Sequence, residues 1–513
     1  MRWLANSIDR LVLAVAPRAG FERLRYRAAA ELAAPSRRGY EGAKGGRRGD
    51  GWVAVGTSAN AEIFPSAARL RNRARQLVRD NFHGERAVRI FAANIVATGV
   101  TARANTGRAT YDKKIDAAWD RWCAECDADG RQDFAGLQAL AVRATVEAGE
   151  MLLRFRPRRS ADGLAVPLQL QLLEPDFLDT GRYQSEGNGN IVLQGIEFDK
   201  LGRRVAYWLF DQHPGDIGVA GRGSFVSRRV DASQIVHLYR QDRIGQIRGV
   251  TWFAPVLMKL RDYDDYSEAE LVRKKIAACL AAFVTTPDAP GTSPLGRVAP
   301  GAAASPRIET FEPGMIGYLK PGEDVKTVSP PGDASMRDYA SISGHEIAAG
   351  LGTTYEDLTG DLSQVNYSSY RAGRLIHRRI VEQFQWTVFV PQFLAPVRTR
   401  WLQAGFVAGA LPVAEDRTKW TFPRWESIDP VKDAAAMRAN LRLGTQTWGQ
   451  AVAAEGEDPE AQLAEIVDWN KRFDAAGIVF DGDPRKVTNT GQTQSAAPAD
   501  GPPAASEAAD GSA

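Results

Sequence analysis

The sequence is poor in the residues that most often carry redox and metal chemistry, with three cysteines and five histidines among 513 residues. So few cysteines exclude a disulfide scaffold and are typical of a protein made in a reducing cytosol. Cys123 and Cys126 form a single C-x-x-C, but nothing nearby supplies the second pair of ligands that zinc requires. We interpret both as core residues of a helix and expect no metal and no cofactor.

Motifs for catalysis and phosphate binding are also missing. No histidine has H-E-x-x-H spacing, no G-x-S-x-G elbow is present, and "GAKGGRRG" lacks the order of an ATP-binding loop. The acidic run "RDYDDYSEAE" could hold a metal in principle, but on a long helix it is more typical of a solvated or intersubunit face. We therefore expect a protein that is not an enzyme.

No run approaches the roughly 18 apolar residues of a membrane span, so no membrane partner is expected. At the N-terminus the apolar run from Leu11 to Ala16 is too short for a secretory signal, and Asp9 and Arg10 precede it. Residues 1–48 contain eleven Lys/Arg and four Asp/Glu, and their apolar residues have helical spacing. This basic amphipathic arm is either a frayed, solvated terminus or a segment that docks onto a partner protein.

Length and charge limit the architecture. A chain of 513 residues exceeds what one core accommodates, so more than one structural unit is expected. The hydrophobic fraction of 44% and the charged fraction of 25% are ordinary for a globular protein. A net charge of +3 is too small for an open surface that coats nucleic acid.

The order of predicted elements indicates an α+β protein. Helices are predicted first, over 65–97, 113–124 and 134–148. Four β-strands follow: "EMLLRFR", "LQLQLL", "IVLQGIEF" and "RRVAYWLF". The last two strands are expected to form a hairpin over "DKLG". A helix over 253–284 would span about 45 Å, which suggests a strut. Residues 285–333 hold nine prolines and seven glycines around two strand-like pieces, "MIGYL" and "VKTV".

A second helix, 335–351, follows this Pro/Gly-rich segment. After it we predict a helix over 366–401 kinked at Pro391 and Pro396, a strand at "KWTF", and two or three helices in 430–476. The end of the chain has no core-forming pattern and is expected to be disordered.

The run "YEDLTGDLSQVNYSSYRAGRLIHRR" is the strongest candidate for a functional site. A polar loop precedes a helix on which Arg371, Arg374 and Arg378 share one face, while Ile376, Ile380 and Phe384 are expected to form the core face. The arginines are either a solvated face, supported by Glu382 four residues after Arg378, or a weak contact with a passing phosphate backbone.

Four runs in the same order resemble the lambda-type phage portal proteins. They are "VHLYRQDRIGQIRGVTWFAPVLMKLRDYDDYSEAELVRKKIAACLAAF", "FEPGMIGYLKPGEDVK", "EIAAGLGTTYEDLTGDLSQVNYSSYRAG" and "IDPVKDAAAMRANLRLGTQT". The resemblance covers roughly residues 60–470 and implies the portal fold, assembled as a ring that usually has twelve copies.

In the terms of that family, the resemblance implies six regions: an α+β wing (51–250), stem helix 1 (251–284), a β clip (285–333), stem helix 2 (334–357), the tunnel loop with the long helix and a wing strand (358–428), and a helical crown (429–480). The arm with its linker (1–50) and the disordered tail (481–513) lie outside the resemblance and are expected from composition. The tunnel loop and the helix after it would line a DNA channel; the channel residues would be Asp361, Ser363, Gln364, Asn366, Tyr367, Arg371, Arg374 and Arg378.

The resemblance also implies a function and partners. The ring would occupy one capsid vertex of the virion, after assembly in the host cytoplasm, and double-stranded DNA would be packaged and ejected through it without sequence preference. Its partners would be the terminase large subunit, the major capsid and scaffold proteins, and the head-completion or connector protein. The alternatives are a DNA-processing enzyme of the packaging machinery (ATPase or nuclease) and a minor capsid shell protein.

Overall fold

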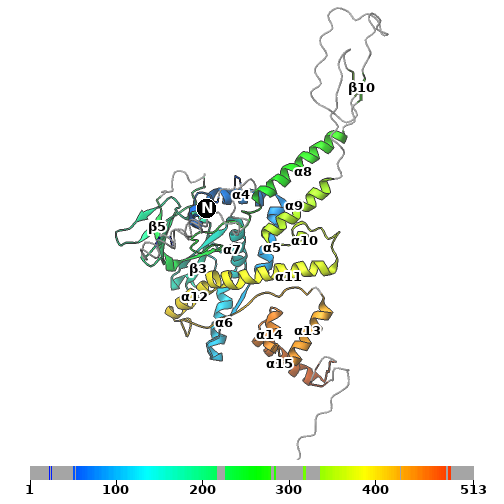
Figure 1. The fold of residues 1–513 in the computed structure, drawn as a ribbon. Helices are drawn as coiled ribbons and strands as arrows, with labels where there is room; N and C mark the ends of the chain where they lie inside the picture. Colours follow the sequence, from blue (N-terminus) through cyan, green and yellow to red (C-terminus); the bar gives the residue numbers. More distant parts are fainter. Residues whose placement is uncertain are drawn as a thin grey trace, which may run out of the picture. The chain divides into compact units, whose positions relative to one another are not determined.

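The structure is a computed structural model with mixed helix and sheet (Figure 1). It describes residues 22, 25, 50–51, 54–216, 226–278, 282–284, 316–318, 335–427, 429–480, 483 and 485–486. The chain divides into two compact units, Met1–Ser58 and Ala59–Ala513, and the second is described below. Nearly all of the predicted arm, clip and tail lies outside the described residues. Among those residues, no helix has both the length and the apolar character that a membrane span needs.

The second unit begins with α3 (Ala59–Ile63), α4 (Ala67–Asp80) and α5 (Phe82–Ile95). The single helix predicted over 65–97 was wrong, because Asn81 divides it. The Asn81 backbone is extended and its side chain accepts hydrogen bonds from the backbone N–H groups of His83 (2.9 Å) and Gly84 (3.1 Å). Asparagine competes in this way with the helical pattern and starts a new helix.

The next helices are α6 (Ala109–Cys123) and α7 (Phe134–Ala148). The bounds of α7 are those predicted: Asp133 caps its start and Gly149, with φ of 92°, ends it. These helices contribute aromatic side chains to the main core. The ring of Trp119 lies 5.0 Å from that of Trp122 and 4.9 Å from that of Trp401.

Two antiparallel sheets follow. The first has the order β3-β2-β9, with β2 (Glu150–Pro157) between β3 (Leu168–Leu173) and β9 (Ile235–Tyr239). The second has five strands, β4 (Gln184–Ser185), β5 (Ile191–Leu193), β6 (Ile196–Phe198), β7 (Arg204–Leu209) and β8 (Arg228–Asp231). It shares a smaller core with β2, which contributes Leu152. Short 3-10 turns lie at Ser160–Asp162, Pro175–Phe177 and Ala232–Gln234.

The hairpin of β6 and β7 over "DKLG" is confirmed. The strand predicted for "IVLQGIEF" is instead a second hairpin, because Gln194 and Gly195 have φ of 49° and 76° and turn the chain between β5 and β6. Two consecutive residues with positive φ are typical of the tight turn that joins twisted antiparallel strands.

The long helix α8 (Leu257–Ala278) is shorter than predicted, about 33 Å at 1.5 Å per residue. Residues 282–284, assigned to stem helix 1, form β10 (Ala282–Val284), which pairs in parallel with β11 (Ile316–Tyr318). The apolar β-branched and aromatic residues there satisfy a strand as well as a helix. Helix α9 (Ser335–Leu351) has the predicted bounds and contacts α8 through a Lys259–Glu346 ion pair of 2.6 Å.

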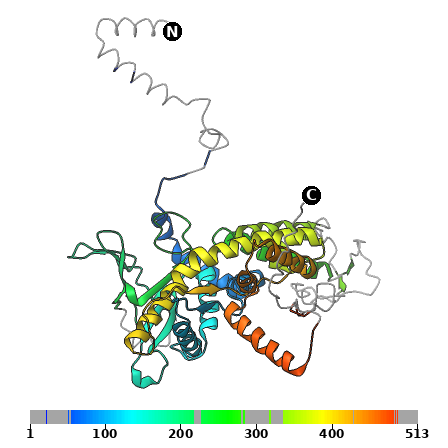
Figure 2. The ribbon, with the colours of Figure 1, turned by 90° about the horizontal axis from the view of Figure 1, so that it is seen from below.

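After α10 (Tyr355–Thr359), a long helical stretch contains α11 (Tyr367–Phe384), a π-helical segment (Gln385–Leu394) and α12 (Ala395–Val407), which Figure 2 shows as one continuous ribbon. The predicted kink at Pro391 is accommodated by the π-helical segment. The core face predicted for α11 was wrong for two of its three residues, since Ile376 is 63% exposed and Ile380 40%. Phe384 is buried as predicted, together with His377 and Val381.

The orientation of α11 depends on a hydrogen bond of His377, which a pattern of apolar residues cannot predict. His377 Nδ1 lies 3.0 Å from the carbonyl oxygen of Gly352, and its ring lies 5.7 Å from that of Phe91. A histidine that is hydrogen-bonded to the backbone can occupy a core position. Because His377 faces the core, Ile376 and Ile380 face outward.

The strand predicted at "KWTF" is β12 (Lys419–Thr421), which pairs with β1 (Thr101–Arg103). It is followed by three helices, α13 (Pro430–Leu443), α14 (Trp448–Ala454) and α15 (Pro459–Ala476). No residue of α13 or α15 is buried.

A buried ion cluster joins the first sheet to the segment that leads into α8. Glu150 and Arg248 have 1% exposed side chains, and Arg248 Nε lies 2.9 and 3.0 Å from the two carboxylate oxygens of Glu150. His237 Nε2 lies 3.0 Å from Glu150 Oε2, and the Gly249 N–H donates to the same oxygen at 2.8 Å. Arg204 Nη1 lies 3.4 Å from His237 Nδ1, and because arginine can only donate, His237 carries its proton on Nε2 and donates it to Glu150.

This cluster predicts a pH dependence of stability. Burial lowers the pKa of His237 from 6.5 to about 4, against the opposing effect of Glu150. The unfolded chain therefore takes up a proton as pH falls below 6.5, whereas the folded chain does so only near pH 4. We expect the free energy of unfolding to fall by about 2 kcal/mol between pH 7 and 5 from this residue alone.

His237→Gln keeps an N–H donor for Glu150 and removes the titration, so its free energy of unfolding should depend less on pH in chemical denaturation at pH 5, 6 and 7. Some dependence should remain, because burial also lowers the pKa of His83 and His377. The exposed His345→Gln is the matched control. An unchanged pH dependence in His237→Gln would contradict the prediction.

Candidate functional site: the loop before α11

Both ends of the candidate loop are fixed by capping. Thr354 caps α10 by accepting a hydrogen bond from the Asp357 N–H at 3.1 Å, and Gly360, with φ of 77°, ends that helix. Arg86 Nε donates to the Asp357 carbonyl at 2.7 Å and ties this end of the loop to α5. At the other end, Asn366 caps α11 by accepting from the Ser369 N–H at 2.9 Å.

Between these caps the loop is exposed. Asp361 accepts a hydrogen bond from the Ser363 N–H at 2.9 Å, and its hydrogen bonds with Ser363 lower the pKa of its carboxyl group. Gln364 and Tyr367 are exposed as well, as is Leu362. The structure therefore brings Asp361, Ser363, Gln364, Asn366 and Tyr367 together in one short polar segment with anchored ends.

The three arginines of α11 are each paired with a carboxylate of the same chain. Arg378 Nε lies 2.7 Å from Glu382 Oε1, which is the pairing that the sequence indicated. Arg374 Nη1 lies 3.3 Å from Asp357 Oδ1 in α10. Arg371 Nη2 lies 3.3 Å from Asp433 Oδ1 in α13.

These pairs hold neighbouring segments together. Arg371 connects α11 to α13, Arg374 connects α11 to α10, and the guanidinium of Arg378 lies 5.3 Å from the centre of the Trp425 ring. Their charge is thus largely compensated within the chain, so the face is less attractive to an anion than three free arginines would be.

The sequence did not point to the one group of side chains in the described residues that could hold a metal ion, Glu174, Asp176 and His213. Arg75 Nη2 already lies 2.6 Å from Glu174 Oε2 and 2.7 Å from Asp176 Oδ2, and Arg71 Nη2 lies 3.1 Å from Asp176 Oδ1. A cation would have to displace two arginines, so the geometry favours an ion-pair cluster. The acids of "RDYDDYSEAE" form local pairs on α8 such as Glu270 with Arg273.

The C-x-x-C sequence lies at the end of α6. Cys126 is fully buried and its thiol donates to the Cys123 carbonyl at 3.3 Å. Burial raises the pKa of Cys123 to about 12, and also raises that of Cys126. Thiols with raised pKa values are poor nucleophiles and poor metal ligands, which supports a packing role.

Comparison with known proteins identifies the family. The sequence model described as "Phage portal protein, lambda family" matches residues 45–385. The chain belongs to this family of phage portal proteins.

Two curated relatives extend the match beyond these residues. The chain is 27% identical over 464 residues to the probable portal protein of Halomonas phage phiHAP-1, across 86% of this chain and 88% of that protein. It is 22% identical over 515 residues to portal protein B of Escherichia phage lambda, across 86% of this chain and 92% of that protein.

Among solved structures, a chain from the neck of an empty gene transfer agent particle is 16% identical, with a TM-score of 0.41 across 75% of this chain and 94% of that chain. The likeness is too weak to support an inference about this chain.

The capping pattern predicts which loop residues stabilise the fold. Asn366→Ala removes the cap of α11 and should lower the free energy of unfolding by about 1 kcal/mol. Ser363→Ala with Gln364→Ala should change it by no more than about 0.5 kcal/mol, because both side chains are exposed and the Ser363 contact comes from its backbone. Urea denaturation of the two variants measures the difference, and an equal loss in both would contradict the assignment.

The buried thiols generate a second prediction. Cys123→Ser with Cys126→Ser should lower the free energy of unfolding by about 1–3 kcal/mol, because a hydroxyl replaces a buried thiol. The zinc content of the purified wild-type protein, measured by elemental analysis, should equal that of the double variant. Stoichiometric zinc that disappears in the variant would show that the cysteines are ligands.

Proposed function

We propose that this chain, with further copies of itself, forms a ring around a channel at one vertex of a phage capsid. Double-stranded DNA is packaged and later ejected through the channel. The family resemblance gives twelve copies and assigns the wing, stem, clip and crown to the regions named above. It also supplies the partners: the terminase large subunit, the major capsid and scaffold proteins, and the head-completion protein.

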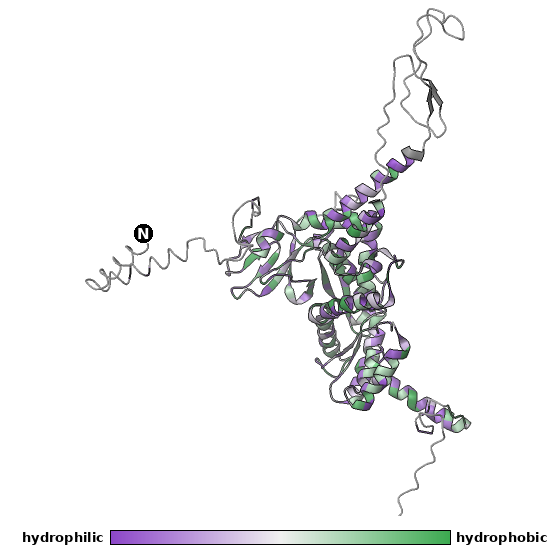
Figure 3. Ribbon diagram, turned by 45° about the vertical axis from the view of Figure 1, so that its right-hand side comes forward, coloured by the Kyte–Doolittle hydropathy of each residue, from purple (hydrophilic) through white to green (hydrophobic). Residues whose placement is uncertain are grey.

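The observation that carries this proposal is the exposed apolar surface of the crown helices. Helices α13 and α15 bury no residue, although both carry large exposed apolar side chains: Val431, Leu443, Leu463, Ile466, Val467 and Trp469. In the ribbon of Figure 3, hydrophobic and hydrophilic positions are interspersed along the described helices. Leu463, Ile466 and Val467 share one face of α15 at i, i+3 and i+4, and exposed apolar faces often mark sites of contact between proteins. Further copies of the chain would cover these faces, and repeated head-to-tail contacts close a ring when the rotation allows it.

The outer face of α11 supports the same proposal. Leu375, Ile376 and Ile380 are exposed on a helix whose opposite side contributes His377, Val381 and Phe384 to the core. A helix with one exposed apolar face and an opposite face packed in the core is suited to contact a neighbouring subunit through the exposed face.

The chemistry of the loop suits the passage of DNA. Each phosphate that a protein binds with a free cation adds affinity and salt dependence, which would retard a sliding duplex. Asp361, Ser363, Gln364, Asn366 and Tyr367 offer polar groups without positive charge. Arg371, Arg374 and Arg378 follow, each held by a carboxylate. Such a surface would guide a duplex without holding it.

Added positive charge should therefore impair the passage of DNA. Ser363→Lys with Gln364→Lys would place two free cations on the loop, and we expect intact rings that package less DNA per particle, with partial recovery at higher salt. Gln403→Lys, an exposed position on α12, is the matched control and should package normally. Negative-stain microscopy reports the rings and DNA quantification the packaging.

Three results would contradict the proposal. Normal packaging by the loop variant would show that the loop does not line the channel. An equal packaging defect in Gln403→Lys would show that the effect of added charge is unrelated to the loop. Wild-type protein that stays monomeric and hydrolyses ATP or DNA would favour a DNA-processing enzyme instead.

A further inference from the structure

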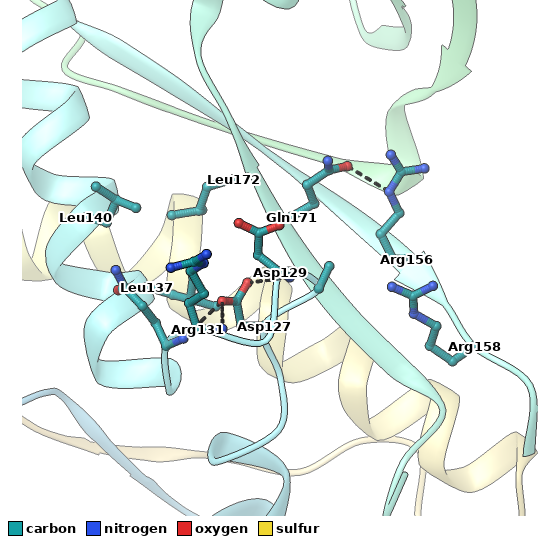
Figure 4. Close-up of a pocket in the computed structure, with 11 residues that line it drawn as sticks. Asp127, Asp129, Arg131, Leu137, Leu140, Arg156, Arg158, Gln171 and Leu172 are labelled. Atoms are coloured by element: carbon teal, nitrogen blue, oxygen red, sulfur yellow. Dashed lines mark hydrogen bonds between the residues drawn. The ribbon is translucent and has the colours of Figure 1, made fainter. Parts of the chain in front are cut away.

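A pocket of about 480 Å³ lies at the outer edge of the first sheet, between β3, the loop before α7 and α7 itself. Figure 4 shows leucines toward one end and arginines of β2 toward the other. The side chains that matter for its chemistry are Arg131, Arg156, Arg158, Leu137, Leu140 and Leu172. The volume is within the usual range for sites that bind small molecules or single peptide side chains.

The arginines of this pocket differ from those near the channel loop. Within the described part of the chain, the side chains of Arg131, Arg156 and Arg158 have no carboxylate partner; Arg156 and Arg158 donate only to the neutral amides of Gln171 and Gln169, at 2.8 Å each. Arg154, two residues before Arg156 on the same face of β2, has a buried Nε without a hydrogen-bond acceptor in those same segments.

These arginines repel one another. Burial, and then the charges of Arg154 and Arg158, lower the pKa of Arg156. Arg154, Arg156 and Arg158 lie on one short stretch, and Arg131 lines the same pocket as the last two. An anion that bonds to several of these arginines would stabilise their positive charges.

The acidic residues of the pocket do not cancel this charge. The carboxylate of Asp127 accepts hydrogen bonds from the backbone N–H groups of Asp129 (3.0 Å), Arg131 (2.9 Å) and Gln132 (3.0 Å), so it is used to shape the loop. Asp129 is exposed, so the pocket has two carboxylates against three arginines and a formal charge of +1. The pocket is therefore positive overall.

The other wall of the pocket is apolar and includes a strand edge. Leu140 is 41% exposed on α7, and Leu137 and Leu172 lie beside it. The N–H of Leu170 donates to the Cys126 carbonyl at 2.7 Å, and its carbonyl accepts from the Ala128 N–H at 2.9 Å, so this residue faces outward from β3. Leu172, two residues further, presents its N–H and C=O at the same edge, where the described residues supply no backbone partner.

We propose that this pocket binds an extended acidic segment of another protein, with carboxylates on Arg131, Arg156 and Arg158, a large apolar side chain on the leucines, and backbone hydrogen bonds to Leu172. Residues 126–128 already bond to the edge of β3 at Leu170, so an extended segment would add backbone hydrogen bonds at Leu172, and its alternate side chains would give specificity. Phosphate groups alone would leave the exposed Leu140 uncovered, whereas Leu137 is already buried. The inference does not depend on ring formation.

The end of this chain does not have the required chemistry. Residues 487–513 contain three acids and no Lys or Arg, but also no Leu, Ile, Met or aromatic residue. The leucine wall would have no matching side chain, so this segment does not fit the pocket.

The test is the binding of a fluorescein-labelled peptide that alternates glutamate with leucine, measured by fluorescence anisotropy with the full-length protein. We expect saturable binding that weakens about tenfold or more in Arg156→Gln with Arg158→Gln, because two charge-assisted hydrogen bonds are lost. Leu140→Ser should also weaken it. Arg438→Gln with Arg442→Gln, two exposed arginines of α13 outside the pocket, is the matched control and should bind normally.

Peptides with glutamine for glutamate, or serine for leucine, should bind weakly. The inference is wrong if the glutamate–leucine peptide shows no saturable binding, or if both substituted peptides bind equally well. Competition by a short DNA duplex that the Arg156/Arg158 variant abolishes would identify a phosphate site instead. Tighter binding of a peptide with the sequence of residues 487–513 would identify the chain's own end as the occupant.

Discussion

The rest of the structure depends on the burial of one carboxylate, Glu150. Its side chain receives hydrogen bonds from Arg248, His237 and the Gly249 backbone, so residues 237–249 must meet the start of β2, 87 to 99 residues earlier in the chain. Removing one partner of such a buried pair typically costs about 3–5 kcal/mol, because the remaining charge is left without compensation. Gly149 and Gly249 are required here, since a Cβ on Gly249 would collide with the Gly149 carbonyl. This arrangement fixes where the chain leaves the sheet to enter α8.

Sequence patterns predicted the elements whose ends carry local signals. Helix α7 begins after Asp133 and ends at Gly149, and both signals can be read directly. The divided helix at Asn81 and the hairpin at Gln194 and Gly195 also depend on local residues. The helical spacing of apolar residues on both sides of Asn81, and the apolar residues on both sides of Gln194 and Gly195, favoured one continuous element in each case. The end of α8 could not be predicted from local sequence, because residues 282–284 form a strand by pairing with residues 316–318.

The candidate site shows the same division between local and distant information. The position of the loop and the Arg378–Glu382 pair follow from sequence spacing. The partners of Arg371 and Arg374 do not, because Asp433 and Asp357 reach α11 only through the tertiary fold. Arg154, Arg156 and Arg158 were visible in the sequence as an alternating run, yet only the structure shows that none of them forms an ion pair with a carboxylate within the described residues. In the proposed ring, arginines paired with carboxylates would lie near the surface that DNA slides past. Arginines without a carboxylate partner, at the edge of the first sheet, would form a surface that holds a partner protein.

The pairing of β1 with β12 has a consequence for the synthesis of the protein. Thr101 lies opposite Thr421, and the main core contains residues from Ala74 to Leu411. At about 5–20 residues per second, a ribosome needs tens of seconds to supply the second strand after the first. During this interval the nascent chain has an incomplete core, and chaperones would have time to bind it. Helices α13 and α15, whose exposed apolar faces are proposed to contact other copies, emerge after β12, so these two faces become available only once the core has all its parts.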